Sequence, residues 1–238
     1  MSHPDGPRLS RRRLLAWAGG LAVTALVPGC GRDRAGSEAA PTSSETSTST
    51  GTRTMAAPDC VLAPELTEGP YYLDLDKVRR DITDGRPGIK LDLAVNVVEA
   101  DACEPIKDAA VDVWHCDAGG EYSGVEGNAG TFLRGIQITD ANGRAEFRTI
   151  YPGWYPGRAV HIHVKVHLGA SETYTGQLFF DDAVTQAVYE ASPYNARPGP
   201  DVTNEADGIF GGSGGVTILA VRPGDPYRGE VTLGVRRA

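Results

Sequence analysis

The chain has 238 residues, a formal net charge of −8 and 23% charged residues. The first 30 residues hold four arginines and one aspartate, which leaves a net charge of −11 on the remainder. An acidic body lacks the basic patches that phosphate backbones require, so its composition argues against nucleic acid as a partner.

The N-terminal segment has the pattern of an export signal. Ser10–Leu15 is basic and contains paired arginines, and the apolar run Leu14–Val27 follows it. That run is shorter than the ~20 residues that a membrane-spanning helix needs. Residues 1–30 resemble a twin-arginine signal, and Cys30 resembles the cysteine that is lipidated in bacterial lipoproteins. We therefore expect an extracytoplasmic protein, anchored by lipid to the outer face of the cytoplasmic membrane or otherwise secreted.

The next segment, residues 31–57, is rich in serine and threonine and nearly free of large apolar residues. Such a composition cannot bury enough surface to fold, and it predicts a disordered, flexible linker. The ~180 residues that follow suit one domain with a sizeable core. We assign this domain to residues 58–238.

Alternation of apolar and polar residues predicts a series of short strands in the domain. They are expected at Lys90–Glu99, from Ala110 onward, and at Gln137–Thr139, Arg144–Ile150, 160–164, Tyr174–Phe180, 216–222 and 230–236. A short helix is expected at Asp182–Glu190 and a long loop at Ser192–Gly215. Seven or so short strands separated by turns predict an all-β fold, an antiparallel β-sandwich of the immunoglobulin or prealbumin type with long active-site loops.

Cysteines beyond the signal are three in number, Cys60, Cys103 and Cys116. Outside the cytoplasm, an odd count permits one disulfide and leaves one thiol over. Cys103 falls in a turn and Cys116 at the far end of the next strand, which disfavours a bond between them because bridged Cα atoms lie within ~7 Å. Cys60 is then one partner of the disulfide, and the sequence leaves the other partner open.

The stretch Tyr151–Val164 carries the clearest chemical signal. Residues two apart in a strand share a face, so His161 and His163 project side by side while the valine and isoleucine residues between and around them form an apolar face. Two imidazoles at that spacing can hold one metal ion. The alternative is an ordinary strand whose polar face carries two histidines.

Nearby tyrosines indicate which metal ion the two histidines would bind. The usual zinc patterns, CxxC and HExxH, do not occur in the sequence. Tyr151 and Tyr155 lie in the turn before the strand, and Tyr122 lies in a glycine-rich loop. A tyrosine with a pKa near 10 becomes a phenolate at neutral pH only beside a strong cation, such as ferric iron.

Five motifs follow one another along the domain. They are TEGPYY (Thr67–Tyr72), VDVWHCDAGGEYSG (Val111–Gly124), FRTIYPGWYPGR (Phe147–Arg158), HIHV (His161–Val164) and GQLFF (Gly176–Phe180). Each motif is weak by itself, but their joint presence in this order is specific. Together they resemble the intradiol ring-cleavage dioxygenases of the protocatechuate and catechol dioxygenase type.

The resemblance implies a non-haem Fe(III) site with one iron per chain. By motif match, Tyr122 and Tyr155 are its tyrosinate ligands and His161 and His163 its histidine ligands. Tyr155 matches the axial ligand, which would also take a proton from a catechol. The implied activity is cleavage of a catecholic ring by dioxygen between the two hydroxyl-bearing carbons, which gives cis,cis-muconate-type products.

Other site residues are also implied by motif match. Arg158 matches an arginine that stabilises carbanion character on the ring, and Gln177 matches a glutamine beside the ligands. Gly69 and Pro70 match residues that line the entrance, or mouth, of the substrate pocket. Together with Tyr71 and Tyr72, they either line that pocket or form a packed loop. The implied partners are a catechol-type substrate and dioxygen. The sequence does not choose among catechol, protocatechuate and hydroxyquinol, and it leaves the oligomeric state open.

Three residues of the same types match no ligand position. We expect Tyr151 to contribute packing, His115 to lie behind the site and His167 to face solvent. Two other functions remain as alternatives: a surface-tethered, non-catalytic β-sandwich binding module, and a zinc hydrolase that adds Asp117 or Glu121 to the histidine pair.

Overall fold

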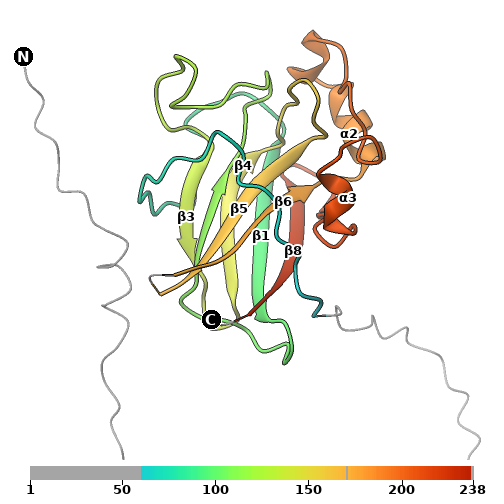
Figure 1. The fold of residues 1–238 in the computed structure, drawn as a ribbon. Helices are drawn as coiled ribbons and strands as arrows, with labels where there is room; N and C mark the ends of the chain where they lie inside the picture. Colours follow the sequence, from blue (N-terminus) through green and yellow to red (C-terminus); the bar gives the residue numbers. More distant parts are fainter. Residues whose placement is uncertain (1–59, 170, 237–238) are drawn as a thin grey trace, which may run out of the picture. The chain divides into compact units, whose positions relative to one another are not determined.

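The computed structural model describes residues 60–169 and 171–236 (Figure 1). The export signal predicted for residues 1–30 and the linker predicted for residues 31–57 lie outside the described residues and stay predictions. In chain order, the elements are β1 (Lys90–Glu99), β2 (Ala110–Trp114), β3 (Arg134–Ile138), β4 (Arg144–Ile150), β5 (His161–Leu168), β6 (Ser171–Phe179), α2 (Asp182–Tyr189), η2 (Tyr194–Ala196), α3 (Phe210–Ser213), β7 (Ala220–Arg222) and β8 (Tyr227–Val235).

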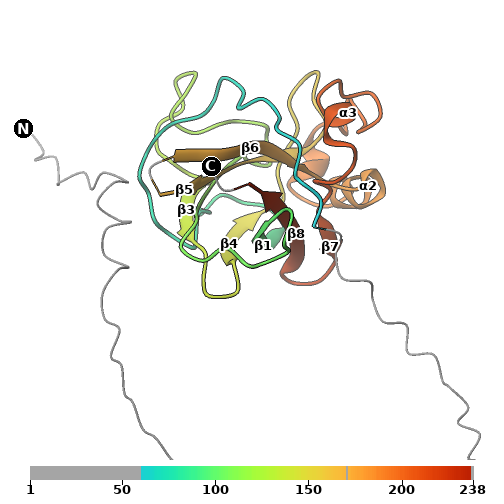
Figure 2. The same ribbon diagram turned by 60° about the horizontal axis from the view of Figure 1, so that its bottom comes forward.

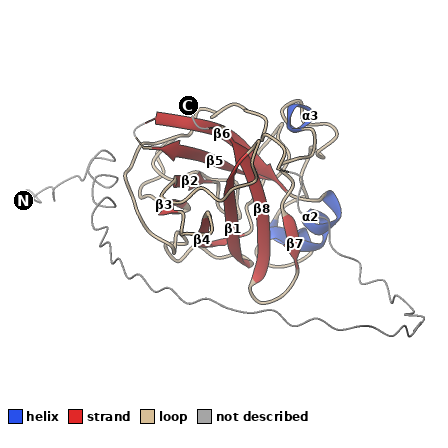
Figure 3. Cartoon of the chain, turned by 90° about the horizontal axis from the view of Figure 1, so that it is seen from below, coloured by secondary structure: helices blue, strands red, loops and turns tan. Residues whose placement is uncertain are grey.

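The strands form two four-stranded sheets, in the orders β4-β1-β8-β7 and β3-β2-β5-β6. The two sheets lie one over the other, and α2 and α3 lie on the same side of them (Figures 2 and 3). This arrangement confirms the predicted all-β sandwich. In the part of the chain that the structure describes, no helix has the length and apolar character that crossing a bilayer requires.

One pairing departs from the antiparallel expectation. β1 and β8 run parallel, with Leu91 opposite Tyr227 and Glu99 opposite Val235, whereas the other strand pairs are antiparallel. Alternation along a strand identifies its buried face but not the direction of its neighbour. The parallel pair is possible because nearly the whole domain lies between the two strands, far more chain than the crossover of a parallel pair needs.

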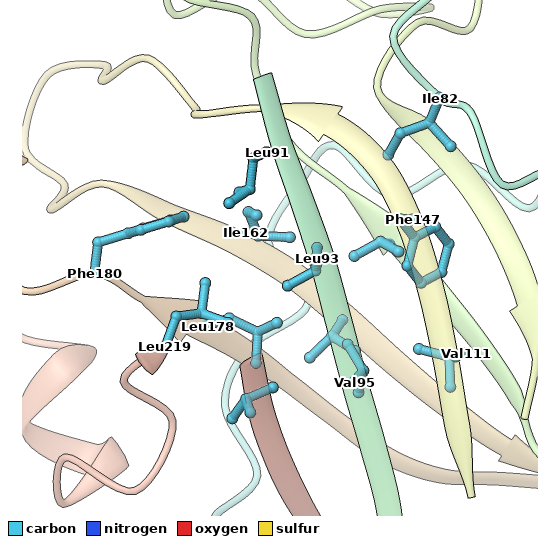
Figure 4. Packing of buried hydrophobic residues seen from close by; sticks show 14 of the residues in the cluster. Ile82, Leu91, Leu93, Val95, Val111, Phe147, Ile162, Leu178, Phe180 and Leu219 are labelled. Carbon is cyan, nitrogen blue, oxygen red and sulfur yellow. The ribbon is translucent and has the colours of Figure 1, made fainter. Parts of the chain in front are cut away.

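The core lies between the two sheets and is built from every second strand residue (Figure 4). Leu91, Leu93 and Val95 of β1 are at most 1% exposed, and they meet Val111 and Ile162 from the other sheet within one buried cluster. Burial of each such side chain contributes roughly 1.5–3 kcal/mol. Because Ile162 faces this core, its two histidine neighbours must face the opposite side of the sheet.

Several predicted elements have different bounds in the structure: β5 continues to Leu168, β6 begins at Ser171, β8 begins at Tyr227 and α2 ends at Tyr189. β3 begins at Arg134 rather than Gln137, and β7 covers only Ala220–Arg222 of the predicted 216–222. The reason for the short β7 is that the residues before it bond to the end of β6: the Phe179 N–H donates to Thr217 O (2.9 Å) and the Leu219 N–H to Phe179 O (2.8 Å). The predicted loop Ser192–Gly215 also contains the short helices η2 and α3.

The disulfide joins Cys60 to Cys103, with their Cα atoms 5.3 Å apart. It links the first described residue to the turn between β1 and β2, and it resolves the partner that the sequence left open. The remaining thiol, that of Cys116, is buried and donates to the carbonyl oxygen of Gly153 at 3.3 Å.

Candidate active site

The site begins with a row of side chains across the outer face of the β3-β2-β5-β6 sheet. Trp114 on β2 lies opposite His163 on β5, and His163 lies opposite Gln177 on β6. Residues directly opposite each other in an antiparallel pair project from the same face. His161, two residues before His163, projects from that face too.

The loops at one end of the sandwich cover this outer face. In Figure 1, the green loop that follows β2 and the yellow loop that precedes β5 rise from the same end of the sheet. They bring Tyr122 and Tyr155 to the histidines. His161 and His163 are therefore only 2% and 1% exposed, although they point away from the hydrophobic core.

Four potential metal donors converge beneath these loops. Nε2 of His161 lies 3.1 Å from Nε2 of His163 and 3.0 Å from the hydroxyl oxygen of Tyr155. The ring of Tyr122 packs edge-on to the ring of Tyr155, with centroids 5.7 Å apart, and lies 6.1 Å from the ring of His163. The structure thus brings together the four residues that the motif resemblance implied as ligands.

The spacing of these donors fits a bound metal ion. Two ligand atoms at right angles, each ~2.1 Å from an ion, are about 3.0 Å apart. Nδ1 of His161 lies 2.7 Å from the carbonyl oxygen of Ala159. A carbonyl can only accept, so Nδ1 carries the proton and Nε2 keeps its lone pair for a metal.

The hydroxyl group of Tyr122 points to the same conclusion. It is buried, and no described residue forms a hydrogen bond of normal geometry with it. A buried polar group without a partner costs roughly 1–3 kcal/mol. A cation at this point would give the oxygen the partner that it lacks.

Burial sets the protonation of all four groups. It lowers the pKa of His161 to about 3 and the pKa of His163 well below its ordinary value, so both imidazoles are neutral at pH 7. Burial also raises the pKa of Tyr155 to about 12 and the pKa of Tyr122 well above 10. Without a cation both tyrosines remain phenols, and only a strongly charged ion can convert them to phenolates.

A carboxylate-completed zinc site is not formed. Among the described residues, no group of three or more His, Cys, Asp and Glu side chains could hold a metal ion. Oδ2 of Asp117 accepts a hydrogen bond from Arg86, and its Oδ1 accepts from the backbone N–H groups of Gly119 and Glu121. Glu121 itself is exposed. Tyrosines, rather than a carboxylate, join the histidine pair.

Arg158 is held beside the donors by two side chains. Its Nε donates to Oδ2 of Asp207 at 2.9 Å, and its Nη2 donates to Oε1 of Gln177 at 2.5 Å. After burial, the positive charge of Arg158 is the next largest influence on Tyr155 and His161, and it lowers the pKa of both. The guanidinium therefore acts electrostatically on the donor cluster.

The predicted mouth residues separate into two groups. Tyr71 stacks on Tyr122 with ring centroids 4.6 Å apart and meets Tyr155 edge-on at 6.2 Å. Tyr72 instead packs against Trp114 at 4.9 Å, so the indole separates it from His163. The chain turns at residues 70–71, and only one of this tyrosine pair reaches the donors.

Gly69 and Pro70 sit in the same segment as these tyrosines. Gly69 has a positive φ of 73°, and a β-carbon there would lie 3.2 Å from Cε1 of His163. Its lack of a side chain therefore allows the backbone to approach the imidazole closely. Pro70 is exposed. Gln177 donates from Nε2 to the carbonyl oxygen of Thr67 at 2.9 Å, which ties the segment to β6.

We expect Gly69→Ala to weaken metal binding beyond its effect on stability. Alanine in a left-handed conformation costs roughly 1–2 kcal/mol, and here its β-carbon would also push the ring of His163. Gly85→Ala is the matched control, because Gly85 has a φ of 75° and free space around it. Urea unfolding should show similar losses for both variants, and metal analysis should show a deficit for Gly69→Ala alone. Equal metal contents would contradict the contact argument.

Two residues of the site were missed by the sequence analysis. The Trp114 indole stacks on the imidazole of His163 almost in parallel, with centroids 4.9 Å apart and planes 7° apart. Pairing of the two predicted strands could have suggested this contact, but the register was unknown. Asp207 lies 49 residues beyond Arg158 in a long connection and had no local signal.

The remaining residues singled out from the sequence lie outside the donor cluster. The hydroxyl group of Tyr151 is hydrogen-bonded to Thr185 at 2.7 Å in the buried interior. His115 is buried, with Nε2 2.7 Å from Oγ1 of Thr149. His167 is partly buried and follows an irregularity in the pairing of β5 with β6.

Comparisons with known proteins give a consistent result. The model of the Dioxygenase family (Dioxygenase_C) matches residues 63–197. An intradiol ring-cleavage dioxygenase from Tetranychus urticae has a similar structure, with a TM-score of 0.71 and 36% identity over 74% of this chain and 95% of that chain. The dioxygenase domain of a dioxygenase carbohydrate-binding protein fusion from Streptomyces sp. SirexAA-E matches with a TM-score of 0.58 and 30% identity, over 74% of this chain and 99% of that chain.

A curated relative is more distant. Chlorocatechol 1,2-dioxygenase from Pseudomonas putida is 29% identical over 139 residues, which are 48% of this chain and 52% of that protein. The chain spans about half the length of the curated relatives it matches.

Proposed function

Because the chain belongs to the intradiol ring-cleavage dioxygenase family, we propose that it uses one Fe(III) to cleave catecholic rings with dioxygen between their hydroxyl-bearing carbons. We assign Tyr122, Tyr155, His161 and His163 as the iron ligands. The observation that carries this proposal is that Nε2 of His161 lies 3.1 Å from Nε2 of His163 and 3.0 Å from the Tyr155 oxygen. The products are cis,cis-muconate-type dicarboxylates.

When bound, ferric iron supplies the Lewis acidity that favours phenolate and catecholate over their protonated forms. The chain supplies the rest. His161 and His163 offer neutral nitrogen donors, because their pKa values are low. The phenolate oxygen of Tyr155 takes one catechol proton, acting as a general base. Arg158 places a fixed positive charge where the ring gains electron density.

Loop and strand residues exclude water and orient the ring. Tyr71 covers Tyr122 with its ring, so one side of the cluster is closed by aromatic surface. Gln177 holds Arg158 on one side and the Thr67 carbonyl on the other, which links the guanidinium to the mouth. A donor set held by packed side chains needs little rearrangement when substrate binds.

Uncharged catechols are the substrate class that this site favours. Oε1 of Glu126 accepts a hydrogen bond from the Tyr71 hydroxyl at 2.9 Å. That hydrogen bond raises the pKa of Tyr71, and partial burial and the negative charges of Glu126 and Glu121 add to the effect. Arg158 is already paired with Asp207. A carboxylate on the ring would meet negative charge at the mouth, which disfavours its approach.

Purified protein from an iron-replete host tests the proposal. We expect about one iron per chain, a red-brown colour from charge transfer between tyrosinate and Fe(III), and uptake of one dioxygen per catechol with formation of cis,cis-muconate. In a panel with catechol, 1,2,4-trihydroxybenzene and 3,4-dihydroxybenzoate, the carboxylated ring should react most slowly. A colourless protein that holds zinc or no metal would refute the assignment, and it would favour the hydrolase or the binding module.

The location of the protein is a second proposal, supported by the sequence of residues 1–30 alone. We propose export by the twin-arginine route, with Cys30 as the lipid attachment point and the domain at residues 58–238 outside the cytoplasmic membrane. Export of folded protein would allow the iron to be loaded first. Cell fractionation of the full chain and of Cys30→Ala tests this, because loss of the lipid should move the protein from the membrane to the soluble fraction.

A further inference from the structure

Asp207 is a buried carboxylate that the motif resemblance does not include. It is 3% exposed and lies between η2 and α3, in a connection that is otherwise remote in sequence from the donors. We propose that Asp207 is a positioning residue for Arg158, and that it fixes the guanidinium against the metal-donor cluster. The proposal rests on the proposed function, because it assigns the purpose of Arg158 to ring cleavage.

The carboxylate accepts four hydrogen bonds, all from N–H groups. Oδ2 accepts from Nε of Arg158 at 2.9 Å and from the backbone of Ala159 at 2.8 Å. Oδ1 accepts from the backbone of Ile209 at 2.7 Å and of Phe210 at 3.1 Å. One oxygen is therefore hydrogen-bonded to the segment that leads to His161, and the other is hydrogen-bonded to the start of α3.

The guanidinium is held from two directions. Asp207 binds its Nε, and Gln177 binds its Nη2. Because a guanidinium is rigid and planar, two fixed contacts define both its position and its plane. No described residue is hydrogen-bonded to Nη1, which leaves that nitrogen for a ligand. Arg158 keeps 17% of its side-chain surface exposed, whereas Asp207 keeps 1%.

The same carboxylate also restrains the backbone beside the ligands. Asp207 accepts a hydrogen bond from the backbone N–H of Ala159, and the carbonyl oxygen of Ala159 accepts one from Nδ1 of His161. Asp207 thus acts on both Arg158 and the segment that orients His161. A misplacement of ~1 Å in such a site can cost about 100-fold in rate.

Asp207→Asn is the sharpest substitution because it keeps the shape and removes the charge. An asparagine offers one acceptor oxygen and one NH₂ group. All four partners are N–H donors, so in either orientation the NH₂ group opposes two of them. We expect kcat for catechol to fall about 10- to 100-fold with KM changed less than about threefold, while the iron content and visible colour persist.

Asp181→Asn is the matched control. Asp181 also accepts hydrogen bonds from backbone N–H groups, those of Ala183 and Val184 at the start of α2. The substitution therefore removes a carboxylate charge from a capping position without touching Arg158. We expect its kcat to stay within about twofold of the wild-type value and its urea midpoint to change little, because asparagine caps a helix about as well as aspartate.

A double-mutant cycle with Arg158→Gln separates positioning from a general structural role. If Asp207 acts mainly through Arg158, the double variant is much faster than the product of the two single effects predicts. The proposal would be overturned if the losses of kcat in the two single variants multiplied in the double variant. A wild-type kcat in Asp207→Asn would also overturn it. The same cycle is measured by urea unfolding, where the two substitutions should be non-additive whatever the activity. A wild-type protein without ring cleavage would refute the proposed function, whereas additive unfolding effects would refute the Asp207–Arg158 coupling.

Discussion

Replacing Tyr155 with phenylalanine is expected to slow ring cleavage by about 100- to 10,000-fold, the usual range for loss of a general base. The substitution removes the one oxygen that lies 3.0 Å from Nε2 of His161. It therefore removes both a proposed metal donor and the group that would take a catechol proton. The visible charge-transfer band should shift because one of two tyrosinates is lost. Dioxygen uptake and the visible spectrum of the purified variant provide the measurement.

Tyr151→Phe is the control for this experiment. Tyr151 lies four residues before Tyr155 in the same connection between β4 and β5. Its hydroxyl group is hydrogen-bonded to Thr185 and takes no part in the donor cluster. Loss of that bond should cost roughly 0.5–1.5 kcal/mol of unfolding free energy and leave the spectrum unchanged. An unaltered band in Tyr155→Phe would reject the assignment of Tyr155 as a ligand.

Replacing His163 with alanine is expected to reduce bound iron to less than about a tenth of the wild-type content, since one of the two proposed nitrogen ligands is lost. The variant also removes the imidazole that stacks on Trp114, so the indole loses its partner. We therefore expect both loss of the metal and a lower urea midpoint. Metal analysis of protein purified from an iron-replete host tests the first effect directly.

His167→Ala is the matched control, because it removes an imidazole from the same strand. His167 lies at the other end of β5, opposite Glu172 and beyond the irregular pairing at Val166. The control should retain its iron and its colour. Full iron occupancy in His163→Ala would show that the iron binds elsewhere.

The histidine pair shows what the local sequence pattern can predict. Alternation along residues 160–164 predicted which side chains share a face, and the structure places Ile162 in the core and both histidines on the outer face. Side-chain direction in a strand depends only on the chain itself, so it can be read from sequence. The same reasoning located β1 and β4 correctly. The ordered motifs added Tyr122, Tyr155 and the family.

Contacts between distant segments could not be read in this way. The parallel pairing of β1 with β8 and the disulfide between Cys60 and Cys103 both depend on which elements become neighbours. Alternation shows a buried face without naming the partner that covers it. The odd cysteine count likewise allowed one bridge without choosing it.

The functional site shows the same division. Spacing alone determined which strand face the two histidines share, and the motif resemblance implied the four candidate donors and Arg158. Only the tertiary structure decided that Tyr71 rather than Tyr72 covers Tyr122, that Trp114 backs His163, and that Asp207 holds Arg158. Loops lack a repeating geometry, so their side chains take directions that the surrounding packing selects. The residue types of the proposed site are therefore visible in the sequence, whereas the contacts that position them are decided by the fold.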